Sequence, residues 1–275
     1  MPISIREIRQ IGEILADAAQ REIMPRFRRL SASAIREKAS AFDIVTEADE
    51  AAEAVITQEL AKAFANATVV GEERAEREPT LLEAIESADL VFLVDPIDGT
   101  KNFASRLPLF GVMTAVVVRG EIAAGVIYDP VCHDWAYCLR GEGAWIEDGS
   151  GLHSDLRVAQ PVPVSQMEGI AGTAFLPEPL RQTVSDNLAR LAMTTWFRCA
   201  AHEYRLAASG FCHLLFYNRL MPWDHAAGWL LHREAGGYSA HFDGTPYRPA
   251  HRTGGLLYTP DEESWHAVRA ALLSP

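Results

Sequence analysis

The sequence predicts an α+β protein built in layers. In the first half, short apolar runs follow one another across tight turns, which is typical of an antiparallel sheet. After the Gly-Ser-Gly segment at 149–151, strand and helix patterns alternate instead. We therefore expect an N-terminal α+β half at 1–150 and a C-terminal α/β half at 151–275. The boundary is expected within 149–165, where Gly, Ser and Pro cluster.

In the first half, an amphipathic N-terminal helix is predicted by apolar residues at helical spacing, namely Ile5, Ile8, Ile11, Leu15 and Ile23. A second helix is expected from about Thr46 to Phe64. Apolar runs predict strands at 68–70, 90–94, 111–118, 121–127, 134–139 and 143–146. The tight-turn pair Arg119-Gly120 predicts that the third and fourth of these strands form a hairpin.

In the second half, strands are expected at 169–174 and 211–217, with helical segments at 179–193 and 203–209 between them. Another helix should follow Trp223-Asp224 and stop at Gly236-Gly237. The segment 260–273 predicts a closing helix.

Composition narrows the function classes. The chain has 275 residues, of which 48% are hydrophobic and 23% charged, which is enough to bury a core. The net charge of −12 argues against a broad surface for nucleic-acid phosphates, although bound divalent cations can invert the field locally. The first ten residues carry charges and no apolar segment, so we expect no secretory signal, and no apolar run approaches membrane-spanning length. We expect a cytoplasmic protein without membrane or nucleic-acid partners.

The cysteines lack a C-x-x-C pair or a zinc-finger spacing. This predicts reduced thiols, mostly buried, at Cys132, Cys138, Cys199 and Cys212.

The segment 95–103, DPIDGTKNF, carries the strongest chemical signal. A buried strand ends at Asp95 and Asp98, and Pro96 between them is rigid and donates no N–H. Two carboxylates and a backbone carbonyl are hard oxygen ligands that suit Mg²⁺ better than Zn²⁺. If a helix or turn starts at Gly99 and Thr100, their N–H groups and the hydroxyl can hold a phosphate. The alternative is a plain Asp-rich turn.

Three further acidic residues are ambiguous when taken singly. Glu72 follows a predicted strand and Gly71, but a Gly-Glu-Glu run is also typical of a solvated loop. Asp49 lies three residues after Thr46 and could be the partner in a helix capping box. Asp224 could be a helix N-cap. Their joint pattern at strand ends and helix starts favours one site that holds several metal ions.

Together these segments resemble the ordered signatures of the inositol monophosphatase family, in the order Lys38, 43–49, 71–73, 95–103 and 223–228. The resemblance spans roughly residues 38–237. It implies the layered αβαβα sandwich of the inositol monophosphatase and fructose-1,6-bisphosphatase type, and often a homodimer.

The resemblance also assigns roles to individual residues. It implies that the metal ligands are Glu72, Asp95, the Ile97 carbonyl, Asp98 and Asp224. Asp49 and Thr100 would orient or activate the attacking water. Glu72 and Lys38 would also be catalytic, with Lys38 near a third, loosely held metal. Phosphate and substrate would be bound by Gly99, Thr100, Arg198, Ala200, Tyr217 and Asp224.

The implied activity is hydrolysis of a small polyol or sugar phosphate by metal-activated water, with two or three Mg²⁺ ions, no covalent intermediate and inhibition by Li⁺. Tyr217 stands where inositol-specific members have a glutamate, and Lys101 replaces a common threonine. Histidinol phosphate or a nucleotide 3′-phosphate is therefore an open alternative. The sequence shows no obvious aromatic or basic adenine pocket, which weighs slightly against nucleotides. A regulatory protein on this scaffold is a further alternative.

The remaining histidines and tryptophans receive structural interpretations. His202, His213 and His225 are expected to be structural rather than catalytic. Trp135, Trp145 and Trp196 are expected in the core or an interface.

Overall fold

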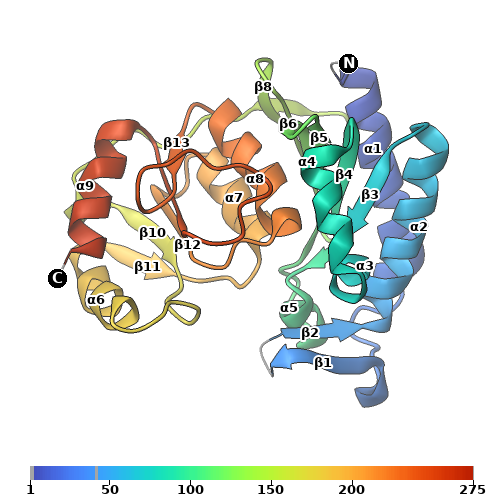
Figure 1. The fold of residues 1–275 in the computed structure, drawn as a ribbon, viewed down its shortest axis with the longest axis horizontal. Helices are drawn as coiled ribbons and strands as arrows, with labels where there is room; N and C mark the ends of the chain where they lie inside the picture. The colour runs from blue at the N-terminus through green and yellow to red at the C-terminus, as the bar shows by residue number, and fades with distance from the viewer. Residues whose placement is uncertain (1–2, 41–42, 275) are drawn as a thin grey trace.

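The computed structural model describes residues 3–40 and 43–274. Two large sheets and three pairs of helices stack as five layers (Figure 1). The outer pair on the first sheet is α1 (Ile5–Ala18) and α2 (Glu47–Ala63), and α7 (Ala200–Ala208) and α8 (Pro222–Glu234) lie between the sheets. The far face of the second sheet packs on α6 (Leu180–Asn187) and α9 (Glu262–Leu273). The expected αβαβα sandwich is confirmed.

The first sheet contains seven strands in sequence order. They are β3 (Thr68–Gly71), β4 (Leu90–Asp98), β5 (Gly111–Val118), β6 (Glu121–Asp129), β7 (Asp134–Leu139), β8 (Gly143–Asp148) and β9 (His153–Asp155). Only the β3–β4 pair is parallel. Between β5 and β6, Arg119 and Gly120 have φ of 51° and 79°, the pair of positive values that matches a two-residue hairpin to the strand twist. The predicted hairpin is confirmed.

The second sheet contains five strands in the order β11-β10-β12-β14-β13. They are β10 (Glu168–Ala171), β11 (Met193–Thr195), β12 (Leu214–Tyr217), β13 (Tyr238–Ala240) and β14 (Leu256–Thr259). The predicted helix at 179–193 is wrong beyond Asn187, because α6 ends there and a 3₁₀ turn leads into β11. Strand β11 forms by parallel pairing with β10, a long-range contact that local sequence does not reveal.

A two-stranded hairpin was not predicted. It joins β1 (Ile35–Ser40) to β2 (Asp43–Thr46) and carries Lys38. Three short helices also follow strands or loops of the first half, namely α3 (Glu72–Arg77), α4 (Ala84–Ser87) and α5 (Thr100–Ala104). Both α3 and α5 begin directly at the edge of the first sheet, where the predicted acidic residues lie.

Capping side chains and a glycine define the predicted helix ends. Ser4 and Thr46 cap α1 and α2 through complete capping boxes. Helix α8 ends at Glu234, and Gly236 follows with φ of 97°, a left-handed conformation that favours glycine. All cysteines are free, and three of the four are buried, as expected. Among the described residues, no helix is both long enough and apolar enough to span a bilayer.

Candidate active site

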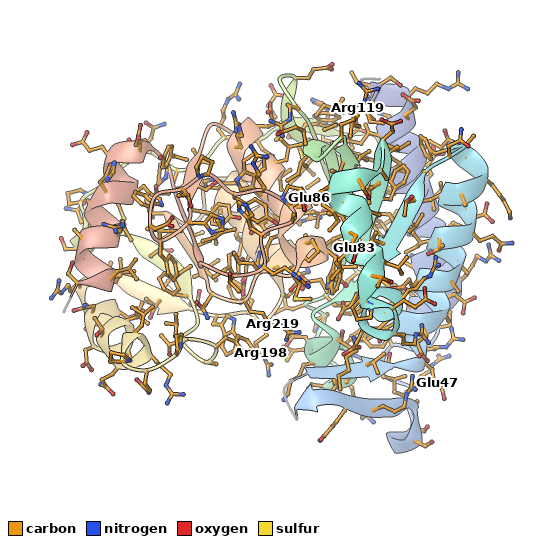
Figure 2. The ribbon with its side chains drawn as sticks, in the orientation of Figure 1. Glu47, Glu83, Glu86, Arg119, Arg198 and Arg219 are labelled. Atoms are coloured by element: carbon orange, nitrogen blue, oxygen red, sulfur yellow. The ribbon has the colours of Figure 1, made fainter. Side chains whose placement is uncertain are left out.

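Three carboxylates from separate elements meet at one edge of the first sheet. Strands β3 and β4 are parallel with Gly71 opposite Val94, so Glu72 and Asp95 follow at the same edge. Asp224 comes from the first turn of α8, which packs against this sheet. One oxygen from each of the three lies within 4.8 Å of the others. They line a cavity of about 330 Å³, which also receives Arg198 and Arg219 from the second half (Figure 2).

The negative charges of this carboxylate cluster would be stabilised by a bound cation. Burial and the negative charges of Glu72, Asp98 and Asp224 raise the pKa of Asp95 well above its ordinary value. Burial and the charges of Glu72 and Asp98 do the same to the pKa of Asp224. A set of carboxylate oxygens this close together is the donor chemistry that Mg²⁺ prefers. The residues therefore fit the metal that the sequence predicts.

Asp98 lines the same cavity but is not one of the three converging carboxylates. Its Oδ2 accepts hydrogen bonds from the Ala201 N–H at 2.5 Å and the Cys199 thiol at 3.0 Å. Burial raises the pKa of Asp98 to about 6. The carboxylate thus joins the edge of the first sheet to the start of α7, and a role as metal ligand stays a prediction.

Gly99 and Thr100 begin α5 beside the cluster. Gly99 has φ of 87°, and a Cβ there would lie 2.9 Å from the Leu109 carbonyl oxygen, so the turn requires glycine. The Thr100 hydroxyl lies 2.9 Å from the Ile97 carbonyl oxygen and 3.0 Å from Asp49 Oδ1. The structure therefore brings the predicted phosphate-binding residues next to the predicted water-orienting pair.

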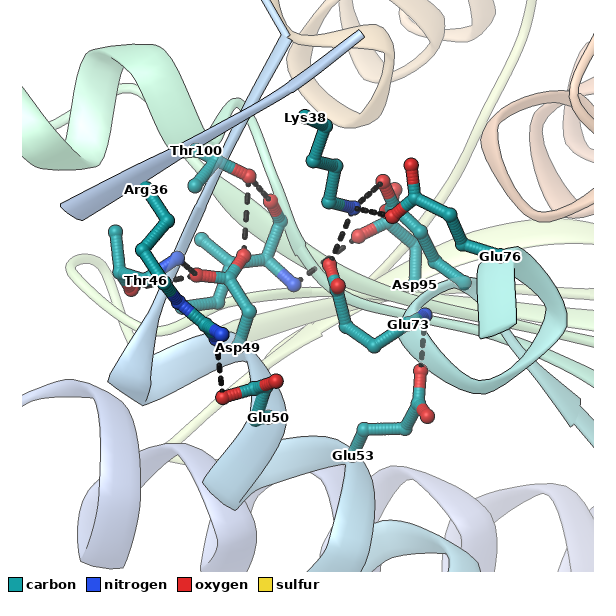
Figure 3. Close-up of polar contacts among 12 residues, drawn as sticks. Arg36, Lys38, Thr46, Asp49, Glu50, Glu53, Glu73, Glu76, Asp95 and Thr100 are labelled. Atoms are coloured by element: carbon teal, nitrogen blue, oxygen red, sulfur yellow. Dashed lines mark hydrogen bonds and ion pairs between the residues drawn. The ribbon is translucent and has the colours of Figure 1, made fainter. Parts of the chain in front are cut away.

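Asp49 combines the two roles that the sequence left open. Its Oδ2 accepts from the N–H and the hydroxyl of Thr46 at 2.8 and 2.5 Å and completes the capping box of α2. Its Oδ1 accepts a hydrogen bond from the Thr100 hydroxyl (Figure 3). Burial raises the pKa of Asp49 to about 7. The capping bonds hold the carboxylate so that one oxygen faces the site.

Lys38 reaches the cluster from the β1–β2 hairpin (Figure 3). Its Nζ lies 3.0 Å from Glu72, 2.6 Å from Glu73 and 3.2 Å from Glu76 carboxylate oxygens, and its side chain is only 5% exposed. Burial alone would lower the pKa of Lys38, but the charges of Glu72 and Glu73 outweigh it and raise the pKa. A permanent ammonium thus neutralises part of the cluster.

Two positioning residues were missed from the sequence. Buried Glu53 accepts from the Glu73 and Arg74 N–H groups at 2.7 and 2.9 Å and so fixes the start of α3, where Glu72 lies. A Cβ on Gly71 would lie 2.3 Å from Glu53 Cδ, which explains the glycine and was the available signal. Asn102 Nδ2 donates to the Leu109 and Phe197 carbonyls at 2.9 and 2.7 Å, tying α5 to the loop before α7.

The predicted substrate residues Arg198, Ala200 and Tyr217 all line the cavity. The Tyr217 hydroxyl donates to Glu203 Oε2 at 2.8 Å, and Glu203 Oε1 accepts from the Phe197 N–H at 3.0 Å. Glu203 was not among the predicted site residues; it is 1% exposed, and burial raises its pKa to about 7. It anchors the cavity wall that carries Arg198.

Comparison with known proteins decides the family. The sequence model of the inositol monophosphatase family matches residues 4–274. The chain belongs to the inositol monophosphatase family. Nus factor SuhB of Escherichia coli K12 is 32% identical over 210 residues, covering 74% of this chain and 73% of that protein. Nus factor SuhB of Haemophilus influenzae is 30% identical over 286 residues, covering 98% and 96%. The solved extragenic suppressor protein suhB of Bartonella henselae matches with a TM-score of 0.79 at 27% identity, covering 96% of this chain and 95% of that one.

In this member of the inositol monophosphatase family, His202, His213 and His225 form hydrogen bonds with other groups of the protein. His225 bonds to the Tyr204 hydroxyl and the Arg219 carbonyl, and burial lowers its pKa to about 4. His202 contacts the Phe110 carbonyl oxygen at 3.2 Å, and His213 Nδ1 accepts from the Glu168 N–H.

The three tryptophans differ in burial. Trp145 is buried in the core, and partly buried Trp135 donates from its indole to the Gly12 carbonyl. The core interpretation is wrong for Trp196, which is 44% exposed and lines the cavity, because the chain leaves edge strand β11 just before it.

Proposed function

We propose that this chain is a Mg²⁺-dependent phosphomonoesterase acting on a small phosphorylated alcohol. The observation that carries the proposal is the convergence of Glu72, Asp95 and Asp224 in one cavity of about 330 Å³. When bound, Mg²⁺ would supply positive charge for the phosphoryl oxygens and lower the pKa of water near the phosphorus. Family membership supports the phosphatase class.

The chain's own residues would divide the work. The three converging carboxylates would hold the cation, with Asp98 and the Ile97 carbonyl as further ligands if two or three ions bind. The Thr100 hydroxyl can donate to Asp49 and keep an oxygen lone pair toward the attacking water. The capping bonds from Thr46 hold the Asp49 carboxylate so that Oδ1 keeps the Thr100 hydroxyl in this orientation.

On the substrate side, we propose that Gly99 and Thr100 hold the phosphate and that Arg198 and Ala200 lie beside the ester. All four line the cavity with the carboxylate cluster. Positioning and charge stabilisation would supply most of the acceleration, as phosphoryl transfer generally requires.

The experiment is phosphate release from inositol 1-phosphate, histidinol phosphate, glycerol 2-phosphate and adenosine 3′,5′-bisphosphate, with Mg²⁺ and with EDTA. We expect release that needs Mg²⁺ and is lost in Asp95→Asn. Asp261→Asn is the matched control, because Asp261 caps α9 and does not line the cavity. If the wild type releases no phosphate from any ester in Mg²⁺, the proposal is wrong.

A second candidate is a regulatory role on the same scaffold. It is favoured by the relatives at 30–32% identity that are named Nus factor SuhB. The absence of a nucleic-acid partner, inferred from charge, stays a prediction for the same reason. In a host strain deprived of this chain, a growth defect rescued equally by wild type and Asp95→Asn would assign the cellular role to this function instead.

We also propose a homodimer and inhibition by Li⁺, as the family resemblance implies. We expect a homodimer, which sedimentation would measure. We also expect inhibition by Li⁺ with Mg²⁺ near saturation, through competition at the weaker cation position, and unchanged activity at high Li⁺ would contradict it.

A further inference from the structure

Aromatic and cationic side chains gather around the same cavity. It is lined by Phe175, Trp196, Arg198 and Arg219, as well as by the carboxylate cluster. Phe175 and Trp196 are 48% and 44% exposed, which is high for large apolar side chains. Figure 2 shows Arg198 and Arg219 on the side of the second half that faces α5. These residues come from separate loops, so no local sequence pattern predicts an aromatic or basic binding surface.

Trp196 is held firmly in this position. Its neighbour Phe197 is bonded on both sides, through its N–H to Glu203 Oε1 at 3.0 Å and through its carbonyl to Asn102 Nδ2 at 2.7 Å. A Cβ on Gly172 would lie 3.0–3.2 Å from three atoms of the indole. One face of the ring therefore packs on the Gly172 backbone. The side chain is a preformed surface rather than a mobile one.

Phe175 is tied to the loop that precedes Asp224. Its carbonyl oxygen accepts a hydrogen bond from Asn218 Nδ2, and the Arg219 guanidinium lies 5.9 Å from its ring centroid. The two exposed rings thus belong to the wall of the cavity that holds the carboxylates. Both are fixed by contacts with residues that line it.

We infer that the cavity selects phosphate esters whose alcohol part carries a planar unsaturated ring, which stacks on Trp196 with Phe175 beside it. This inference rests on the proposed phosphatase function. Stacking requires only the π-face of a ring, so a nucleobase or an imidazole would satisfy it. Arg198 and Arg219 supply positive charge for the phosphate dianion in an otherwise acidic chain. A polyol gains less here, because it has no planar face to stack on these rings.

The test compares kcat/KM for adenosine 3′-monophosphate, histidinol phosphate and glycerol 2-phosphate. In Trp196→Ala we expect a loss of roughly tenfold for at least one ring-bearing ester and less than about twofold for glycerol 2-phosphate. Trp196→Phe should retain most of the activity, because it keeps an aromatic face. Phe211→Ala is the matched control, since Phe211 is 72% exposed and does not line the cavity.

A second readout does not depend on turnover. The indole N–H resonance of Trp196, identified by its disappearance in Trp196→Phe, should shift on addition of adenosine or imidazole but not glycerol. If the wild type hydrolyses no ester, the proposed function fails while the resonance still decides the stacking. If esters are hydrolysed but Trp196→Ala lowers all of them equally, and neither ring compound shifts the resonance, the inference is overturned. A selective loss for only one ring-bearing ester supports the inference and identifies the ring.

Discussion

Replacing Asp95 by Asn removes one negative charge from the carboxylate cluster and keeps the side-chain oxygen. In the wild type, Asp95 Oδ1 accepts a hydrogen bond from the Ile97 N–H at 3.0 Å, and an Asn oxygen can accept the same bond. Asp95 is 2% exposed, so water screens its charge poorly. We expect Asp95→Asn to be more stable than wild type without divalent cations and to gain less stability than wild type from Mg²⁺.

The magnitude follows from the spacing of the oxygens. They lie within 4.8 Å of one another, and two unit charges at that distance repel by about 3.5 kcal/mol at an effective dielectric constant of roughly 20. Asp95 faces both Glu72 and Asp224, so at this longest separation the two repulsions together come to roughly 7 kcal/mol when all three carboxylates are ionised. Because the raised pKa of Asp95 lets the wild type relieve part of this repulsion by binding a proton, we expect a gain of about 1–3 kcal/mol at mildly alkaline pH.

Mg²⁺ should stabilise the wild type more than the variant and so remove or reverse this difference in stability. A cation that binds only the folded wild type stabilises it by about 2.7 kcal/mol at a hundred times its dissociation constant. The Asn variant offers a weaker ligand and should gain less. The assay is urea unfolding of both proteins in EDTA and in Mg²⁺. Asp261→Asn makes the same atomic change at the cap of α9, where Oδ1 accepts from the Ser264 N–H at 2.7 Å.

One pattern would refute the reasoning. If Asp95→Asn lowers the free energy of unfolding in EDTA while Asp261→Asn does not, the three carboxylates do not repel one another as the geometry requires. Equal stabilisation of wild type and Asp95→Asn by Mg²⁺ would show that the cation binds elsewhere.

Three other changes test the supporting residues. Lys38→Met should lower the free energy of unfolding in EDTA by about 3 kcal/mol, because the buried Glu73 carboxylate loses its partner. Urea unfolding measures this, and an unchanged free energy of unfolding would contradict it. Gly71→Ala should lower the free energy of unfolding by about 1–3 kcal/mol, because the new Cβ displaces Glu53 from the start of α3. Thermal unfolding measures this, and an unchanged midpoint temperature would contradict the role of Glu53 in fixing α3. The Glu203 carboxyl has its pKa raised from 4.5 to about 7, so its contribution to stability is complete below pH 4.5 and is lost as pH rises through about 7. Relative to Glu203→Gln, the wild type should therefore lose about 3 kcal/mol between these pH values, and a difference that grows in favour of wild type would show the sign to be wrong.

The carboxylate cluster was partly predictable because it depends on short local patterns. Glu72 and Asp95 each follow an apolar run, and parallel pairing of β3 with β4 then places them at one edge. Asp224 was a weaker case, since its position depends on the packing of α8 against the first sheet. Its interpretation as an N-cap is wrong, because the N-cap of α8 is Met221.

The supporting contacts could not be predicted in the same way. Glu53 lies within a regular helical pattern, and its role depends on N–H groups 20 and 21 residues further along the chain. The β1–β2 hairpin that carries Lys38 lacks an alternating apolar pattern, because Arg36, Glu37 and Lys38 follow one another in β1, and Arg36 and Glu37 are exposed. Both features arise only when elements pack together, so no local spacing indicates them.

Trp196 shows why selectivity is harder to predict than reaction chemistry in this chain. A large apolar side chain is expected in a core on average. Here the short edge strand β11 ends at Thr195, the next residue faces the cavity, and Gly172 leaves room for its ring. The metal end of the cavity is built from residues adjacent to strand ends, which a sequence displays directly. The other end, which we propose to receive the alcohol, is lined by residues from the loops at 172–175, 196–198 and 218–219. Substitutions in those loops can therefore change which ester fits while the carboxylate cluster stays intact.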